Sequence, residues 1–81
     1  MTKKKVLLCS GDKVNRFVAT ATKYRFPIHL TTGRYRIDGK SLIGIFSLNL
    51  SKPVTVEVPD EGEGIEEFFE EIQEFEYVKD E

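Results

Sequence analysis

Cysteine and histidine are the side chains most often used as nucleophiles and metal ligands, and this sequence has one of each, Cys9 and His29. Neither has a second cysteine or histidine near it, so we expect neither a metal site nor a nucleophile pair. His29 stands on the polar side of an alternating segment, which predicts a surface residue. Cys9 precedes a helical pattern, where a thiolate can be stabilised, but we expect it to be a small buried apolar side chain.

The segment Ser10–Asp12 (SGD) could also take part in chemistry, because free backbone amides at the start of a helix can hold an anion. Serine and aspartate at this place also satisfy those amides themselves, as N-capping residues. Capping explains the segment as well as anion binding does, so it does not define a site.

The elements that must position these residues follow from the spacing of apolar side chains. Alternation predicts strands over 3–9, 27–32, 34–37 and 53–59, with a turn at Gly33. Apolar residues at helical spacing predict helices over 12–24 and 65–75. The segment 41–50 (SLIGIFSLNL) fits a buried strand or a short helix equally well. The order is β-α-β-β-(α)-β-α, which predicts one antiparallel sheet covered by helices on one side.

The core of this arrangement is predicted from the same periodicity. Alternate side chains of the strands should face the helices, and each helix should pack one apolar stripe against them. The strand residues expected inward are Val6, Leu8, Ile28, Leu30, Val54, Val56 and Val58, and the helix residues expected against them are Phe17, Val18, Phe68, Phe69 and Ile72.

Length and charge limit the classes of protein to consider. The 81 residues suit a single domain spanning 1–81, with no stretch long enough to cross a bilayer and no signal-peptide pattern. One cysteine allows no internal disulfide, which agrees with a cytoplasmic location. Residues 1–52 have eleven Lys/Arg against two acids, and residues 53–81 have one Lys against twelve acids. We expect the two halves to fold against each other and partly cancel, and we do not expect nucleic acid as a partner.

The run Lys40–Leu48 (KSLIGIFSL) and the element order resemble the HPr family, the histidine-containing phosphocarriers of the sugar phosphotransferase system. The segment Thr20–Leu30 (TATKYRFPIHL) is similar to the end of that family's first helix and its second strand. The resemblance covers residues 3–76. It implies an α+β fold, the HPr-like open-faced β-sandwich with a four-stranded antiparallel sheet and three helices on one face. It also makes 41–50 a helix with Ser41 exposed at its N-cap.

The departures from the family bear on function. A phosphocarrier of this family uses a histidine and a nearby arginine at the start of its first helix. Counting back without gaps, the histidine position falls on Ser10 and the arginine position on Asp12. The resemblance therefore implies a chain without the catalytic histidine, and we expect no enzyme activity, no catalytic residue, no cofactor and no metal.

By the same resemblance, Ser41 is the candidate for regulatory phosphorylation, because a dedicated kinase modifies the matching serine in Gram-positive HPr proteins. Lys40, Leu42, Ile43 and Phe46 would then bind a protein partner, either the kinase or a transcriptional regulator. The plainer interpretation is that Ser41 only caps a helix. A different function stays open, in which the HPr scaffold is a binding module for an acidic partner or nucleic acid with no phosphoryl role. We expect a cytoplasmic monomer or weak dimer.

Overall fold

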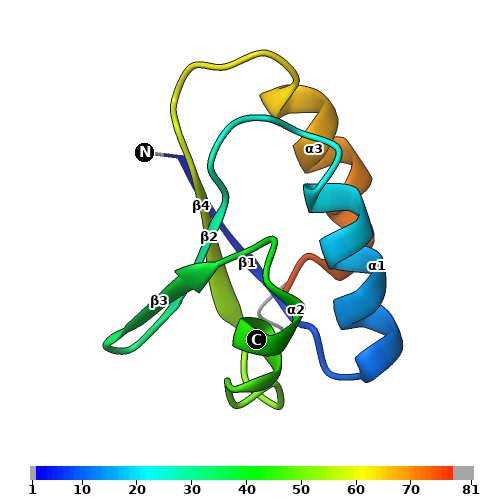
Figure 1. Ribbon diagram of the computed structural model, residues 1–81, viewed down its shortest axis with the longest axis vertical. Helices are drawn as coiled ribbons and strands as arrows, with labels where there is room; N and C mark the ends of the chain where they lie inside the picture. Colours follow the sequence, from blue (N-terminus) through cyan, green and yellow to red (C-terminus); the bar gives the residue numbers. More distant parts are fainter. Residues whose placement is uncertain (1, 78–81) are drawn as a thin grey trace.

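The computed structural model describes residues 2–77, which form a four-stranded sheet with helices on one side (Figure 1). The strand order is β1-β4-β2-β3, and every neighbouring pair is antiparallel. Alternating Val54, Val56 and Val58 make β4 a central strand, because their branched side chains pack well on one face of a sheet. The strands are β1 (Thr2–Val6), β2 (His29–Thr32), β3 (Tyr35–Asp38) and β4 (Val54–Val58).

Three helices cover one face of this sheet and leave the other face open. They are α1 (Gly11–Ala21), α2 (Leu42–Phe46) and α3 (Ile65–Glu71), and a 3-10 turn over Gln73–Phe75 follows α3. The predicted α+β class and the open-faced sandwich with three helices are therefore confirmed. The ambiguous segment 41–50 is a helix, not a strand.

The core lies between the sheet and the helices, as the periodicity predicts. All seven strand residues expected inward are buried. Phe17 and Phe68 meet edge to face with ring centroids 6.2 Å apart, in a geometry that aromatic pairs favour. Val18 and Phe69, expected in the same core, are only partly buried. The Phe69 ring lies at its margin, 5.7 Å from the ammonium of Lys4.

The end of the described chain pairs with the first strand, which the periodicity did not predict. The Leu7 amide donates to the Phe75 carbonyl (2.8 Å), and the Tyr77 amide donates to the Lys5 carbonyl (2.9 Å). These bonds occupy the outer edge of β1, where unpaired backbone groups would otherwise remain. The ladder with β4 ends at the pair Val6–Val54, because β4 begins at Val54 after Pro53, so β1 is shorter than the predicted 3–9.

Candidate functional site

Ser41 caps α2, as the resemblance implies. Its backbone is extended (φ −101°, ψ 106°), and its Oγ accepts a hydrogen bond from the Gly44 amide at 3.2 Å. The Ser41 carbonyl accepts from the Ile45 amide at 3.0 Å, which closes the first turn. Ser41 is partly buried, so the expectation that it is exposed is wrong. The cause is that capping folds the hydroxyl back onto the helix.

Gly44 makes room for this cap. A Cβ at residue 44 would lie 3.1 Å from the Ser41 Oγ and 3.4 Å from its Cβ, closer than such atoms ordinarily approach. Glycine weakens a helix interior, so its presence in the short helix α2 needs a packing reason, and the close serine hydroxyl provides one. Sequence reasoning recorded Gly44 as part of the family motif without recognising this role.

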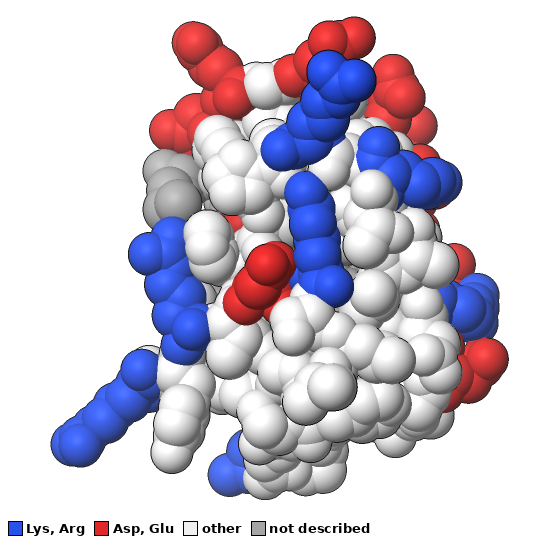
Figure 2. All heavy atoms as spheres, viewed as in Figure 1, with Lys and Arg blue, Asp and Glu red and all other residues white. Residues whose placement is uncertain are grey.

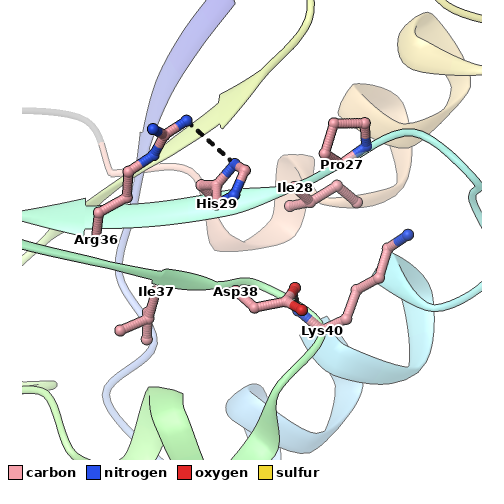
Figure 3. Close-up of a pocket in the computed structure, with 7 residues that line it drawn as sticks. All are labelled: Pro27, Ile28, His29, Arg36, Ile37, Asp38 and Lys40. Carbon is pink, nitrogen blue, oxygen red and sulfur yellow. Dashed lines mark hydrogen bonds between the residues drawn. The ribbon is translucent and has the colours of Figure 1, made fainter.

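Lys40 points away from the α2 surface. Its ammonium donates to the Tyr24 carbonyl at 2.6 Å, just beyond the end of α1, and its amide donates to Asp38 Oδ1 at 2.9 Å. Figure 3 shows Lys40 and Asp38 beside the end of β3. Lys40 is thus next to Ser41 in sequence, while its charge is held at another part of the molecule.

The other residues expected to bind a partner lie together on the outside of α2. Leu42 is 38% exposed, Ile43 86% and Phe46 48%, whereas Ile45 is the buried residue that anchors the helix. The lower part of the face seen in Figure 2, where α2 lies in Figure 1, is largely free of charged side chains. We call Leu42, Ile43 and Phe46 the α2 patch. Contiguous exposed apolar side chains of this kind mark contact surfaces.

The start of α1 contains no imidazole. Ser10 caps the helix, and its Oγ accepts from the Lys13 amide at 3.2 Å. Asp12 lies in the first turn with its carboxylate 3.6 Å from the Arg16 guanidinium. Cys9 is exposed, 3.7 Å from the Lys13 ammonium, so the expectation of a buried cysteine is wrong. The reason is that the chain leaves the sheet after Val6 and turns outward at Cys9 before the helix begins.

His29 lies in β2, not at the start of a helix. Its Nδ1 is 3.4 Å from Arg36 Nη2, and because a guanidinium only donates, this ring nitrogen acts as the acceptor. The two side chains border a cavity of about 380 Å³ between the ends of β2 and β3 (Figure 3). Asp38 and Lys40 line the same cavity.

The described residues 2–77 contain no group of three or more His, Cys, Asp or Glu side chains that could hold a metal ion. Within the same range, no helix is both long and apolar enough to span a membrane.

Comparison with known proteins places this geometry in a family. A family model described as "PTS HPr component phosphorylation site" matches residues 13–76, starting just after Asp12. No curated protein matches the chain. The crystal structure of HPr-C-His from Thermoanaerobacter tengcongensis superposes with a TM-score of 0.75 and 23% identity, covering 91% of this chain and 89% of that one.

A second solved structure shows the same fold. The histidine-containing phosphocarrier protein of Mycoplasma superposes with a TM-score of 0.71 and 11% identity, covering 90% of this chain and 89% of that one. At these identities the two structures establish the fold, while the family model spans most of the sequence. This chain therefore belongs to the HPr family of the phosphotransferase system.

Proposed function

We propose that this HPr-family protein binds a protein partner through the α2 patch, that phosphorylation of Ser41 controls the binding, and that it does not pass on phosphoryl groups. One observation carries the proposal. Among residues 2–77, four large hydrophobic side chains are exposed, and three of them form the α2 patch directly after Ser41. Exposed apolar side chains that gather beside a modifiable hydroxyl suit a surface that a partner covers under control of that hydroxyl.

The start of α1 supports the absence of phosphocarrier chemistry. Phosphoryl transfer through a carrier needs a nucleophile that forms a labile phosphate, and a serine hydroxyl forms a much more inert ester than an imidazole. Ser10 is such a hydroxyl and is engaged as a helix cap. At the position where the family has an arginine, the exposed Asp12 adds a carboxylate, which pairs with the Arg16 guanidinium at 3.6 Å.

The geometry of Ser41 is compatible with modification. Its Oγ acts as an acceptor toward Gly44, so capping does not use the hydroxyl proton that a phosphoryl group would replace. A phosphate adds close to two negative charges and three acceptor oxygens. On Ser41 these charges would lie next to Leu42 and Ile43, so the same partner would meet a different surface before and after modification. The family supports a cytoplasmic protein partner, either a kinase or a transcriptional regulator.

The test separates modification from capping. HPr kinase and ATP are offered to wild type and to Ser41→Asn, which keeps an N-capping side chain but has no hydroxyl to esterify. We expect phosphate on wild type alone. Phosphorylated and unphosphorylated wild type, together with Ile43→Ser, are then used to capture proteins from the native cell extract for identification by mass spectrometry. We expect a protein that depends on phosphorylation and is lost with Ile43→Ser. Equal capture by all forms, with no phosphate on wild type, contradicts the proposal.

A further inference from the structure

Tyr24 connects the end of α1 with α3 and with the loop that precedes α3. Its hydroxyl donates to the Glu71 carboxylate of α3, and its ring lies edge to face with Phe68, with 5.5 Å between the ring centroids. A Cβ on Gly64, just before α3, would lie 3.0 Å from the Tyr24 ring. The neighbouring Lys23 pairs with the same Glu71 carboxylate. A movement of the Tyr24 backbone would therefore disturb the contacts between α1 and α3.

The Tyr24 backbone is held in turn by Lys40. The Lys40 ammonium donates to the Tyr24 carbonyl at 2.6 Å, in a part-buried position. Lys40 forms no ion pair within residues 2–77. Its charge is thus held by a neutral carbonyl, at the end of a side chain whose four-carbon stem is flexible.

The chain around Lys40 is fixed, so only the Lys40 side chain has freedom to move. The Gly39 amide donates to the Ile28 carbonyl at 2.7 Å, and the Ser41 amide donates to the Asp38 carbonyl at 3.1 Å. The Lys40 amide donates to Asp38 Oδ1 at 2.9 Å. A Cβ on residue 39 would lie 2.7 Å from Ile28 Cγ2, which shows how closely this turn packs on β2. The Lys40 backbone therefore stays beside Ser41, while its ammonium lies at the end of α1.

We propose that phosphorylation of Ser41 breaks the hydrogen bond between the Lys40 ammonium and the Tyr24 carbonyl, which we call the Lys40 latch. The inference rests on the modification of Ser41 proposed above. A phosphate on Ser41 would place close to two negative charges on the residue next to Lys40. An ionised phosphate is a stronger acceptor for an ammonium than a neutral carbonyl is, because both partners are then charged. The Lys40 side chain would therefore turn from Tyr24 to the phosphate.

The consequence would reach beyond the α2 patch. Without the Lys40 latch, the turn after α1 keeps two longer backbone bonds, from the Lys23 amide to the Thr20 carbonyl (3.1 Å) and from the Tyr24 amide to the Ala21 carbonyl (3.2 Å). A cavity of about 480 Å³ lies at this turn and is lined by Lys23, Tyr24, Arg25, Glu63, Gly64 and Glu67. One modification would thus change both the α2 patch and the lining of this cavity.

Amide hydrogen exchange of the full chain tests the inference. Phosphoserine is incorporated at position 41 during translation, so that the test needs no kinase, and mass spectrometry verifies it. We expect the Lys23 and Tyr24 amides to exchange about tenfold faster than in unmodified wild type, the factor that corresponds to the loss of one hydrogen bond to a charged group. Lys40→Met keeps an apolar stem without the ammonium and should show the same increase without any phosphate. Slow exchange of the Val56 amide, in the central strand β4, shows that each form is folded.

Phosphoserine in the Lys40→Met variant is the decisive measurement. If the phosphate acts through the Lys40 latch, it should cause no further increase in this variant. The matched control, Lys52→Met, removes an ammonium elsewhere and should respond to phosphate as wild type does. Unchanged exchange in phosphorylated wild type or in Lys40→Met overturns the inference, as does a further increase when Lys40→Met is phosphorylated. Failure of HPr kinase to modify wild type would contradict only the proposed function, because the phosphoserine of this test is supplied during translation.

Discussion

Phe46 of α2 lies against Gly11 at the start of α1: its ring Cζ is 3.8 Å from where a Cβ on residue 11 would stand. This contact joins the α2 patch to the N-terminus of α1, so that the exposed apolar side chains and the Ser10 cap belong to one continuous surface. A partner that covers Ile43 and Phe46 would therefore also reach the start of α1. Sequence reasoning treated these two helix starts as separate sites.

The capping role of Ser41 can be measured apart from any regulatory role. Ser41→Ala should lower the free energy of unfolding by about 0.5–2 kcal/mol, because the Gly44 amide loses its acceptor. Ser41→Asn should remain close to wild type in urea unfolding, since asparagine caps as well as serine. Ser10→Ala, the same change at the start of α1, serves as a matched control and should show a loss of similar size. An unchanged stability of Ser41→Ala would mean that the hydroxyl does not stabilise α2.

Phe68, rather than Phe69, should be the aromatic residue of α3 on which stability depends most. Phe68 is fully buried, and its ring meets those of Phe17, Tyr24 and Phe26. Phe68→Ala should cost about 3–5 kcal/mol, a large part of the 5–15 kcal/mol that stabilises a typical domain. Phe69→Ala should cost clearly less, because that ring is only partly buried.

If Phe68→Ala does not fold, the milder pair Phe68→Leu and Phe69→Leu keeps the comparison measurable. Urea midpoints for this pair should fall in the same order. The opposite order would mean that Phe69, rather than Phe68, contributes more to the core.

The hydroxyl of Tyr24 should titrate unusually late. Its hydrogen bond to Glu71, together with burial and the negative charges of nearby glutamates, raises its pKa to about 12 from an ordinary value of 10. A folded-state pKa above the unfolded value adds stability below pH 10 that is lost as the pH rises toward 12. Phenolate absorbance should show a late-titrating tyrosine in wild type that is missing in Tyr24→Phe. If a late-titrating tyrosine is still seen in Tyr24→Phe, the raised pKa belongs to another tyrosine.

Glu71 should contribute to the loss of stability in acid. Its carboxylate accepts hydrogen bonds from the Lys23 ammonium and then the Tyr24 hydroxyl, which hold its pKa below the ordinary value of 4.5. The resulting stability is complete above pH 4.5 and is lost as the pH falls through the lower folded-state pKa. Melting temperatures of wild type and Glu71→Gln should therefore differ at neutral pH and converge in strong acid. Glu66→Gln, which removes an exposed acid that forms no ion pair within residues 2–77, is the control and should show no such convergence.

The parts of the fold that sequence could predict are those fixed by local periodicity. Valines at alternate positions predict β4, and the spacing of Val14, Phe17 and Ala21 predicts the buried side of α1. Contacts between distant parts of the chain were not predictable in this way. The hydrogen bond from the Tyr77 amide to the Lys5 carbonyl covers the outer edge of β1, and no local pattern predicts it.

The same distinction holds for the candidate site: its local features were predictable, and its contacts between distant residues were not. Ser41 as an N-cap follows from the residues near it and from the family motif, and it is confirmed. The direction of the Lys40 side chain depends on the Tyr24 carbonyl, sixteen positions away, and was not foreseen. The exposure of Cys9 was wrongly predicted for a related reason, since it depends on where the chain leaves the sheet.

The last prediction concerns phosphoryl transfer itself. Incubated with phosphoenolpyruvate and the general enzyme of the phosphotransferase system, this protein should acquire no acid-labile phosphate, because Ser10 stands where the family has its histidine and Asp12 where it has its arginine. An HPr protein with its histidine, labelled in the same reaction, shows that the assay works. His29→Ala and Ser10→Ala identify the source of any label. Acid-labile phosphate that disappears with His29→Ala would contradict the prediction and make β2 the acceptor, whereas an acid-stable label lost with Ser10→Ala would assign transfer to the serine cap of α1.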